Sequence, residues 1–155
     1  MSARRLPPGT RLLDVAGHAK PQGSKRHVGN GVMVESSKGL KAWRDQLKVL
    51  AQQQRPPHPF AGPVEITLGF RFVRPKSHYF TGRRSDVLRE DAPRWATTKN
   101  VGDGSKLQRA VEDSLVDACW LADDSLVARW VGEKVWVDRH TGTPGVRITV
   151  RELAA

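Results

Sequence analysis

The segment VEITLGFRFV, residues 64–73, is the part of the chain that indicates the fold most directly. Its apolar residues alternate with polar or small ones, which is the period-two pattern of a strand that is buried on one face. Downstream lie a helical pattern at residues 107–118 and two more strand patterns, at residues 126–137 and 146–150. Because strands and helices do not alternate regularly, we predict a single α+β domain with a mixed β-sheet and two main helices.

The residues before this segment add a strand, a hairpin and the second helix. Residues 11–17 form a short apolar run typical of a strand, and residues 27–35 hold an Asn-Gly pair between apolar flanks, which favours a tight hairpin turn. Ser36 or Ser37 can cap a helix that ends before Pro56. The apolar residues of this helix recur at helical spacing: Leu40, Trp43, Leu47, Leu50 and Ala51.

Length and composition favour one globular domain. A chain of 155 residues with 38% hydrophobic residues fits one domain, which we place at residues 11–155, with residues 1–10 as a candidate disordered N-terminus. The longest apolar run has five residues, against about 18 for a membrane span, and no secretion signal is recognisable. We therefore expect a cytoplasmic protein without a membrane partner, in which Cys119 is a buried small apolar residue rather than a nucleophile.

The charge of the chain points to a polyanionic partner. It holds 26 Lys and Arg residues against 16 Asp and Glu residues, a net charge of +10, so nucleic acid is the leading partner class. Residues 103–124 reverse this sign, with six acidic and two basic side chains. Such a segment would repel a phosphate unless a divalent metal ion lay between them; the alternative interpretation is a solvated acidic helix face.

Residues 74–101 lack periodicity and combine basic with aromatic side chains. Cations bind phosphates and rings stack on unpaired bases, so this composition suits DNA or RNA with an open backbone, although an ordinary solvated loop is the alternative. The basic loop at residues 20–26 lacks the length of a phosphate-binding P-loop, and we expect no nucleotide cofactor. The candidate DNA-binding residues are Lys20, Lys25, Arg26, Arg74, Lys76, Arg83, Arg84, Lys106 and Lys134.

Three acidic residues are candidates for a metal site. Asp103 precedes the second helix, Asp113 lies within it and Asp124 follows it. A helix of about 14 residues is ~21 Å long, so the three carboxylates converge only if the following strand packs antiparallel to the helix. In that geometry they would supply hard oxygen ligands for Mg²⁺, with Mn²⁺ as a substitute, and two such ions could activate a water for phosphodiester hydrolysis.

Several motifs occur in a specific order along the chain. They are DxSKLxRxxxDxL at residues 103–115, DD at residues 123–124, PQGSKR at residues 21–26 and RPK at residues 74–76. In this order the motifs resemble the RusA-type Holliday junction resolvases, in particular their phage and actinobacterial branch. The resemblance covers about residues 15–150 and implies a RusA-like fold in a homodimer.

The resemblance also implies roles for individual residues. Metal-binding carboxylates, the first two of them catalytic, are Asp103, Asp124, Asp113 and Asp123. The family's second carboxylate is replaced by Ser105, a neutral and weaker metal ligand whose alternative role is a helix cap. The family's catalytic lysine is replaced by Arg109, which keeps a charge for the phosphate but cannot release a proton; its alternative role is an ion pair with Asp113.

The function that the resemblance implies is a Mg²⁺-dependent endodeoxyribonuclease that resolves four-way DNA junctions by symmetric paired nicks, in DNA recombination and repair. Two opposed nicks need two sites related by a two-fold axis, hence a homodimer. We accordingly expect Trp120, Trp130 and Trp136 to be core or dimer-interface aromatics rather than base-stacking platforms. The main alternative is a non-catalytic branched-DNA binding homologue with a decayed metal site; an RNA-binding module would leave the acidic spacing unexplained.

Overall fold

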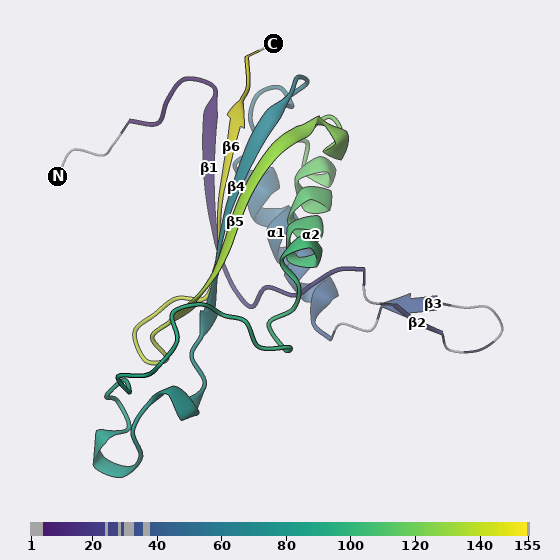
Figure 1. The fold of residues 1–155 in the computed structure, drawn as a ribbon. Coiled ribbons are helices and arrows are strands. Elements are labelled where there is room, and N and C mark those ends of the chain that lie inside the picture. Colours follow the sequence, from purple (N-terminus) through teal and green to yellow (C-terminus); the bar gives the residue numbers. More distant parts are fainter. Residues whose placement is uncertain (1–4, 24, 28, 30–32, 36–37, 155) are drawn as a thin grey trace.

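The structure is a computed structural model, and it describes residues 5–23, 25–27, 29, 33–35 and 38–154. Four of its strands are β1 (Thr10–Ala16), β4 (Val64–Val73), β5 (Val127–Val137) and β6 (Gly145–Glu152). They form one sheet in the order β1-β6-β4-β5 (Figure 1). Strand β4 pairs parallel with β5, whereas β6 pairs antiparallel with β1 and β4, so the predicted mixed sheet is confirmed.

Two helices, α1 (Leu40–Gln53) and α2 (Gly104–Asp117), cover one face of this sheet (Figure 1). The alternating residues of β4 that face the helices are almost completely buried: Val64, Ile66, Leu68 and Phe70. They share one hydrophobic core with Trp43 and Leu47 of α1 and with Leu107 and Val111 of α2. Both predicted helices are therefore confirmed. Among the described residues, neither helix has the length and the apolar composition of a membrane span.

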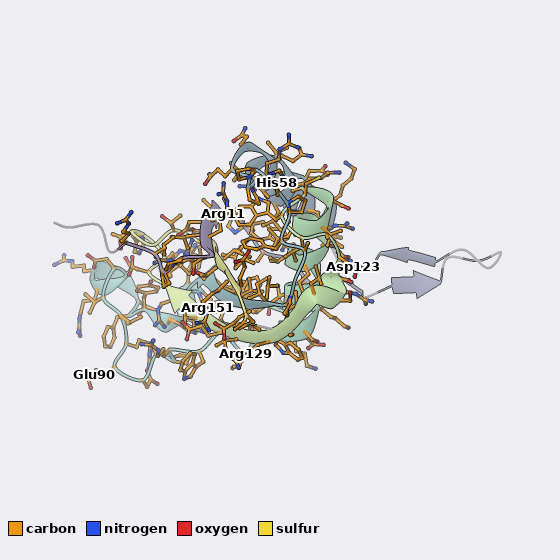
Figure 2. All side chains as sticks on the ribbon, turned by 90° about the horizontal axis from the view of Figure 1, so that it is seen from above. Arg11, His58, Glu90, Asp123, Arg129 and Arg151 are labelled. Atoms are coloured by element: carbon orange, nitrogen blue, oxygen red, sulfur yellow. The ribbon has the colours of Figure 1, made fainter. Side chains whose placement is uncertain are left out.

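The opposite face of the sheet is polar and carries a charged cluster. Glu65 is mostly buried there and accepts a hydrogen bond from Arg151 at 2.9 Å. Arg129 lies 3.4 Å from the other carboxylate oxygen of Glu65 and is more exposed. Figure 2 shows Arg129 and Arg151 on the same side of the ribbon, away from His58.

The C-terminal end of α2 corrects one prediction. Cys119 is exposed, with a φ of 62°, and follows the last helical turn. Its N–H donates to Val116 and the N–H of Trp120 donates to Leu115, the bonding pattern of a left-handed helix stop. The prediction that Cys119 is buried is wrong, because this stop turns its side chain outward while Ala118 and Trp120 fill the core.

The N-terminal hairpin is present as β2 (Lys25–His27) and β3 (Met33–Glu35), which pair antiparallel. The Asn30-Gly31 turn predicted between them and the predicted caps Ser36 and Ser37 lie outside the described residues. Helix α1 instead has Gly39 at its N-cap position, with a φ of 78°.

Between β4 and α2 the chain forms an extended loop, and we call residues 74–93 the arm. It contains two short 3₁₀ turns, η1 (Lys76–His78) and η2 (Gly82–Arg84), and projects away from the sheet (Figure 1). The buried Tyr79 anchors it, since its hydroxyl donates to Asp138 at 3.1 Å and accepts from the N–H of Arg139 at 2.7 Å. The predicted irregular loop is thus an ordered, anchored element.

Candidate active site

The loop after β1 is held directly against α2. The N–H of Gln22 donates to the carbonyl oxygen of Lys106 at 3.0 Å, and the side-chain amide of Gln22 donates to the carboxylate of Asp113. Just before α2, Gly102 has a φ of 93°, and a Cβ there would lie 2.7 Å from Cγ of Pro21. Glycine therefore allows the chain to enter α2 at this close approach, which places the basic loop beside the acidic helix.

Arg109 lies on the exposed side of α2 that faces this loop. A Cβ at Gly23 would be 3.2 Å from Nη1 of Arg109, so the guanidinium and the loop backbone adjoin one another. Within the described residues no ion pair joins Arg109 to Asp113, and the carboxylate of Asp113 accepts a hydrogen bond from Gln22. The alternative in which Arg109 only pairs with Asp113 is therefore wrong.

Asp103 occupies the N-cap position of α2, but its side chain makes no capping hydrogen bond. The carboxylate is exposed and lies 3.8 Å from Nζ of Lys106. Ser105 is also exposed and already lies inside the helix, one residue beyond Gly104. The alternative role of Ser105 as a helix cap is thus wrong, since Ser105 follows the cap position, and Asp103 at that position is directed toward Lys106.

The two acidic residues after α2 have different surroundings at the short turn η3 (Asp124–Leu126). Asp123 accepts a hydrogen bond from the N–H of Ser125 at 2.8 Å, and hydrogen bonding by Ser125 lowers the pKa of Asp123. Asp124 is exposed and lies close enough to α2 to act on the pKa of Glu112. Asp123 therefore holds the turn, whereas Asp124 adds negative charge beside the helix.

Glu112 also belongs to this region, although it occupies an unspecified position of the motif at residues 103–115. Burial raises the pKa of Glu112 above its usual range, against a lowering effect of the hydrogen bond that Gln108 donates at 2.7 Å. The charges of Asp124 and Asp113 raise the pKa of Glu112 further. The only sequence signal for it was its place in the acidic segment, next to Asp113.

The predicted metal ligands do not form one compact cluster. Asp103 precedes α2 and Asp124 follows it, and within the residues that the structure describes no three acidic or histidine side chains form a group that could hold a metal ion. Strand β5 does contact α2 and runs back along it, as convergence requires (Figure 1). Mg²⁺ binds through one or two carboxylates and completes its shell with waters and phosphates, so Asp124 and Glu112 fit such an ion by their chemistry.

The predicted DNA-binding residues fall into two groups. Near the start of α2, Lys134 donates to the carbonyl oxygen of Gly102 at 2.9 Å, and Lys106 lies beside Asp103. Lys20 lies next to the N-cap of α1. Lys106 and Lys134 thus lie near the start of α2, against which the loop containing Lys20 is held.

The second group lies in the arm. Arg74 donates to the carbonyl oxygen of Pro93 at 2.7 Å and so braces the base of the arm. Arg84 lies 4.0 Å over the ring of Phe80, and Lys76 and Arg83 are exposed. Lys25 and Arg26 lie in β2, and their side chains are outside the part that the structure describes. The cations of this second group therefore lie in the arm, and Lys25 and Arg26 lie in the β2-β3 hairpin; both elements project from the domain (Figure 1).

A pocket of about 230 Å³ lies between the first turns of α2 and strand β5. Gly104 and Gln108 of α2 line one side, and Trp130, Gly132 and Lys134 of β5 line the other. Gly104 directly follows Asp103, so this pocket adjoins the candidate site.

Two comparisons with known proteins bear on this site. The sequence model of a family described as Endodeoxyribonuclease RusA matches residues 15–151. The matched range includes both helices and every candidate site residue, from Lys20 to Lys134. No curated protein matches the chain.

Proposed function

Because the chain belongs to the RusA family of endodeoxyribonucleases, which are Holliday junction resolvases and generally depend on a divalent metal, we propose that it resolves four-way DNA junctions in a Mg²⁺-dependent reaction. Hydrolysis of one phosphodiester bond in each of two opposed strands converts a junction into two nicked duplexes. Two such cuts related by a two-fold axis need two sites, so the active form is a homodimer.

The observation that carries this proposal is the contact of Gln22 with α2, within the range matched by the family. It brings the basic loop and the exposed side of the acidic helix together, although Gln22 and Asp113 are 91 positions apart in the sequence. Cations that bind a DNA backbone and carboxylates that bind a metal are both needed at a phosphodiester. The juxtaposition supplies both.

We assign the metal to the carboxylates of the acidic segment. Asp103 and Asp124, which precede and follow α2, are the proposed catalytic ligands, with Asp113, Asp123 and Glu112 in support. Within the described residues no three of them form one cluster, so waters and phosphate would complete the shell of a bound ion. The metal would supply an activated water and would stabilise the leaving oxygen. Burial raises the pKa of Glu112 first, and the charges of Asp124 and Asp113 raise it further, so Asp124 lies close enough for a bound cation to meet both carboxylates.

Arg109 binds the phosphate as a fixed charge. Its guanidinium stays protonated at any working pH, so it stabilises negative charge and transfers no proton. Its exposed position beside Gly23 places it between the loop and the helix, where a phosphate would be reached from both.

The arm and the loop after β1 hold the junction arms through the DNA backbone. Backbone contacts recognise shape rather than base sequence, and each neutralised phosphate releases counterions. Junction binding should therefore weaken steeply with salt. The members of this surface are Lys20, Lys25, Arg26, Arg74, Lys76, Arg83, Arg84, Lys106 and Lys134.

A second candidate function is branched-DNA binding without cleavage. Ser105 favours this second function, because it places a neutral hydroxyl where the RusA family motif has its second carboxylate. The two functions share the DNA surface and differ only in metal-dependent hydrolysis.

The test uses a labelled four-way junction and a linear duplex of the same sequence, each with Mg²⁺, Mn²⁺ or EDTA. We expect nicks at symmetric positions in two opposed strands of the junction, with metal only, and an intact duplex. Tight junction binding without nicks under any metal would support the second candidate. Equal cutting of the linear duplex would contradict junction selectivity.

A further inference from the structure

Strand β5 is an edge strand whose two halves differ. The outer edge of its C-terminal half is covered by residues 94–96. There the N–H of Trp136 donates to the carbonyl oxygen of Arg94, and the N–H of Ala96 donates to the carbonyl oxygen of Lys134, both at 3.0 Å. These bonds show that even-numbered residues of β5 direct their backbone groups away from β4. Residues 128–133 are exposed, and no described strand pairs with their outer edge. Such an open edge is a template for another strand.

The same open segment carries unusual side chains. Trp130 and Val131 are 60% and 55% exposed, the highest values among the large hydrophobic residues described. Arg129 shares Glu65 with Arg151, which binds that carboxylate more closely. Glu133 has no ion pair within the described chain. Within the described chain Glu133 therefore lacks an opposite charge, and Trp130 and Val131 remain largely uncovered.

We propose that two copies of the chain pair antiparallel along this edge, about a two-fold axis at Val131. This inference rests on the proposed homodimer and specifies its interface. The register places Arg129 opposite Glu133 of the second copy, on the polar face of both sheets. Trp130 lies opposite Gly132 on the helix face, and as even-numbered residues they exchange backbone hydrogen bonds. Each pair occurs twice because the interface is self-complementary.

Neighbouring registers lack this complementarity. An axis at Trp130 would set the two indole rings against each other and Arg129 against Val131. An axis at Arg129 would set like charges opposite, which is destabilising. An axis at Gly132 would bring Trp130 against Lys134, whose carbonyl oxygen already accepts from Ala96. Charge and size therefore select the axis at Val131.

This pairing connects the interface to the candidate active site. Gly132 lines the pocket that also borders Gly104, the residue after Asp103. Trp130 of the second copy, lying over Gly132, would close one wall of that pocket. Because the axis is normal to the sheet, the helices of both copies lie on one side, and both sites face the same junction.

Charge variants test the register. Arg129→Glu and Glu133→Arg each place like charges across the axis and should weaken dimerisation at least tenfold, measured by sedimentation equilibrium against the monomer mass of 17.2 kDa. An equimolar mixture of the two variants restores opposite charges and should form heterodimers. Glu90→Arg, an equal change on the exposed arm, is the control and should leave the dimer intact.

Two further variants test the packing and the axis. A Cβ at Gly132 meets only the carbonyl oxygen of Leu68, at 3.8 Å, so Gly132→Val fits the subunit but collides with Trp130 of the second copy. Gly69→Val, where a Cβ meets nothing within 4 Å, is its control. With Cys119→Ser as background, Val131→Cys should cross-link under oxidised glutathione, since facing non-hydrogen-bonded residues have Cα atoms about 4.5 Å apart. Ala128→Cys should not.

The outcomes separate the interface from the function. A dimer that resists Glu133→Arg and Gly132→Val, or fails to cross-link at residue 131, overturns this interface even if it cuts junctions. A dimer cross-linked through Val131→Cys that leaves junctions uncut supports the interface and overturns the proposed function. A monomeric chain overturns the interface and the homodimer together.

Discussion

The side-chain amide of Gln22 donates a hydrogen bond to Asp113, and the backbone N–H of the same residue donates to the carbonyl oxygen of Lys106. This double contact fixes the loop after β1 along about two turns of α2. It joins the most basic loop of the N-terminal half to the acidic helix of the C-terminal half. The other amide atom, Oε1 of Gln22, is buried and has no hydrogen-bond partner in the described chain, so the amide is held chiefly by Asp113.

Gln22→Ala should release the loop from Asp113. A hydrogen bond to a charged group contributes roughly 1.5 to 3 kcal/mol, and partial exposure places this one at the low end, so we expect a loss of about 1.5 kcal/mol in the free energy of unfolding. Junction affinity should fall several-fold, because the cations beside α2 lose their position. Urea unfolding and a gel-shift titration measure the two effects. Gln52→Ala, on the exposed side of α1, should change neither.

Asp103→Asn and Asp124→Asn should each reduce junction cleavage by about a hundredfold or more, because a neutral amide is a weak ligand for a hard cation. Junction binding in EDTA should stay equal or improve, since each change removes a negative charge near the DNA. Single-turnover cleavage and gel shifts measure the two properties. Asp117→Asn, at the other end of the same helix, should leave cleavage unchanged. Loss of binding in a folded Asp103→Asn variant would contradict its assignment as a metal ligand.

Ser105→Asp should restore the second carboxylate of the motif. Because Ser105 is exposed at the start of α2, an added carboxylate fits without repacking and should lower the Mg²⁺ concentration needed for half-maximal cleavage several-fold. Ser105→Asn has nearly the same size without the charge and is the matched control. If both variants respond alike to Mg²⁺, residue 105 is not a metal ligand.

Glu112→Gln should change the dependence of stability on pH. Burial raises the pKa of Glu112 in the folded state, so the folded state favours the protonated side chain. The contribution of this protonation to the free energy of unfolding is complete below the unfolded-state pKa and is lost as pH rises through the folded-state pKa. Glutamine does not ionise, so the melting temperature of Glu112→Gln should rise relative to that of the unmodified protein as pH increases from about 4 to 7. Mg²⁺ should reduce that advantage if the ion binds beside Glu112. Glu90→Gln, on the exposed arm, should show no such trend.

Asp138→Ala should loosen the arm. Hydrogen bonds from the N–H groups of His140 and Thr141, and from Tyr79, lower the pKa of Asp138 to about 2. Because the pKa is lowered, the hydrogen bonds to the ionised Asp138 contribute to stability above the unfolded-state pKa, near pH 4. That contribution is lost as pH falls toward 2. At pH 7 the variant should exchange the amide hydrogens of the arm faster and bind junctions more weakly. Asp86→Ala, on the exposed arm, is the control.

Periodicity predicted the elements of the core well. Val64, Ile66, Leu68 and Phe70 alternate because β4 is buried on one face, and the pattern of Leu107 and Val111 marks the buried side of α2. Such patterns depend only on which residues face the core. The exposure of Cys119 could not be predicted in this way, because it follows from a left-handed residue at the helix stop.

The candidate site was predictable as a set of residues, but not as an arrangement. Spacing identified Asp103, Asp113 and Asp124, whereas their surroundings depend on contacts across the fold. Gln22 meets Asp113 only after the N-terminal loop docks on α2, and the raised pKa of Glu112 arises from burial by the folded chain. Neither effect has a local sequence pattern.

The most direct test of paired incision uses a supercoiled plasmid that extrudes a cruciform. Two symmetric cuts within one binding event give a linear plasmid, whereas a single cut releases the supercoiling and gives a nicked circle. With Mg²⁺ we predict linear product from the start of the reaction, and no product with EDTA or Asp103→Asn. Nicked circles alone would contradict a two-site dimer, and an uncut plasmid bound tightly by the protein would contradict hydrolysis.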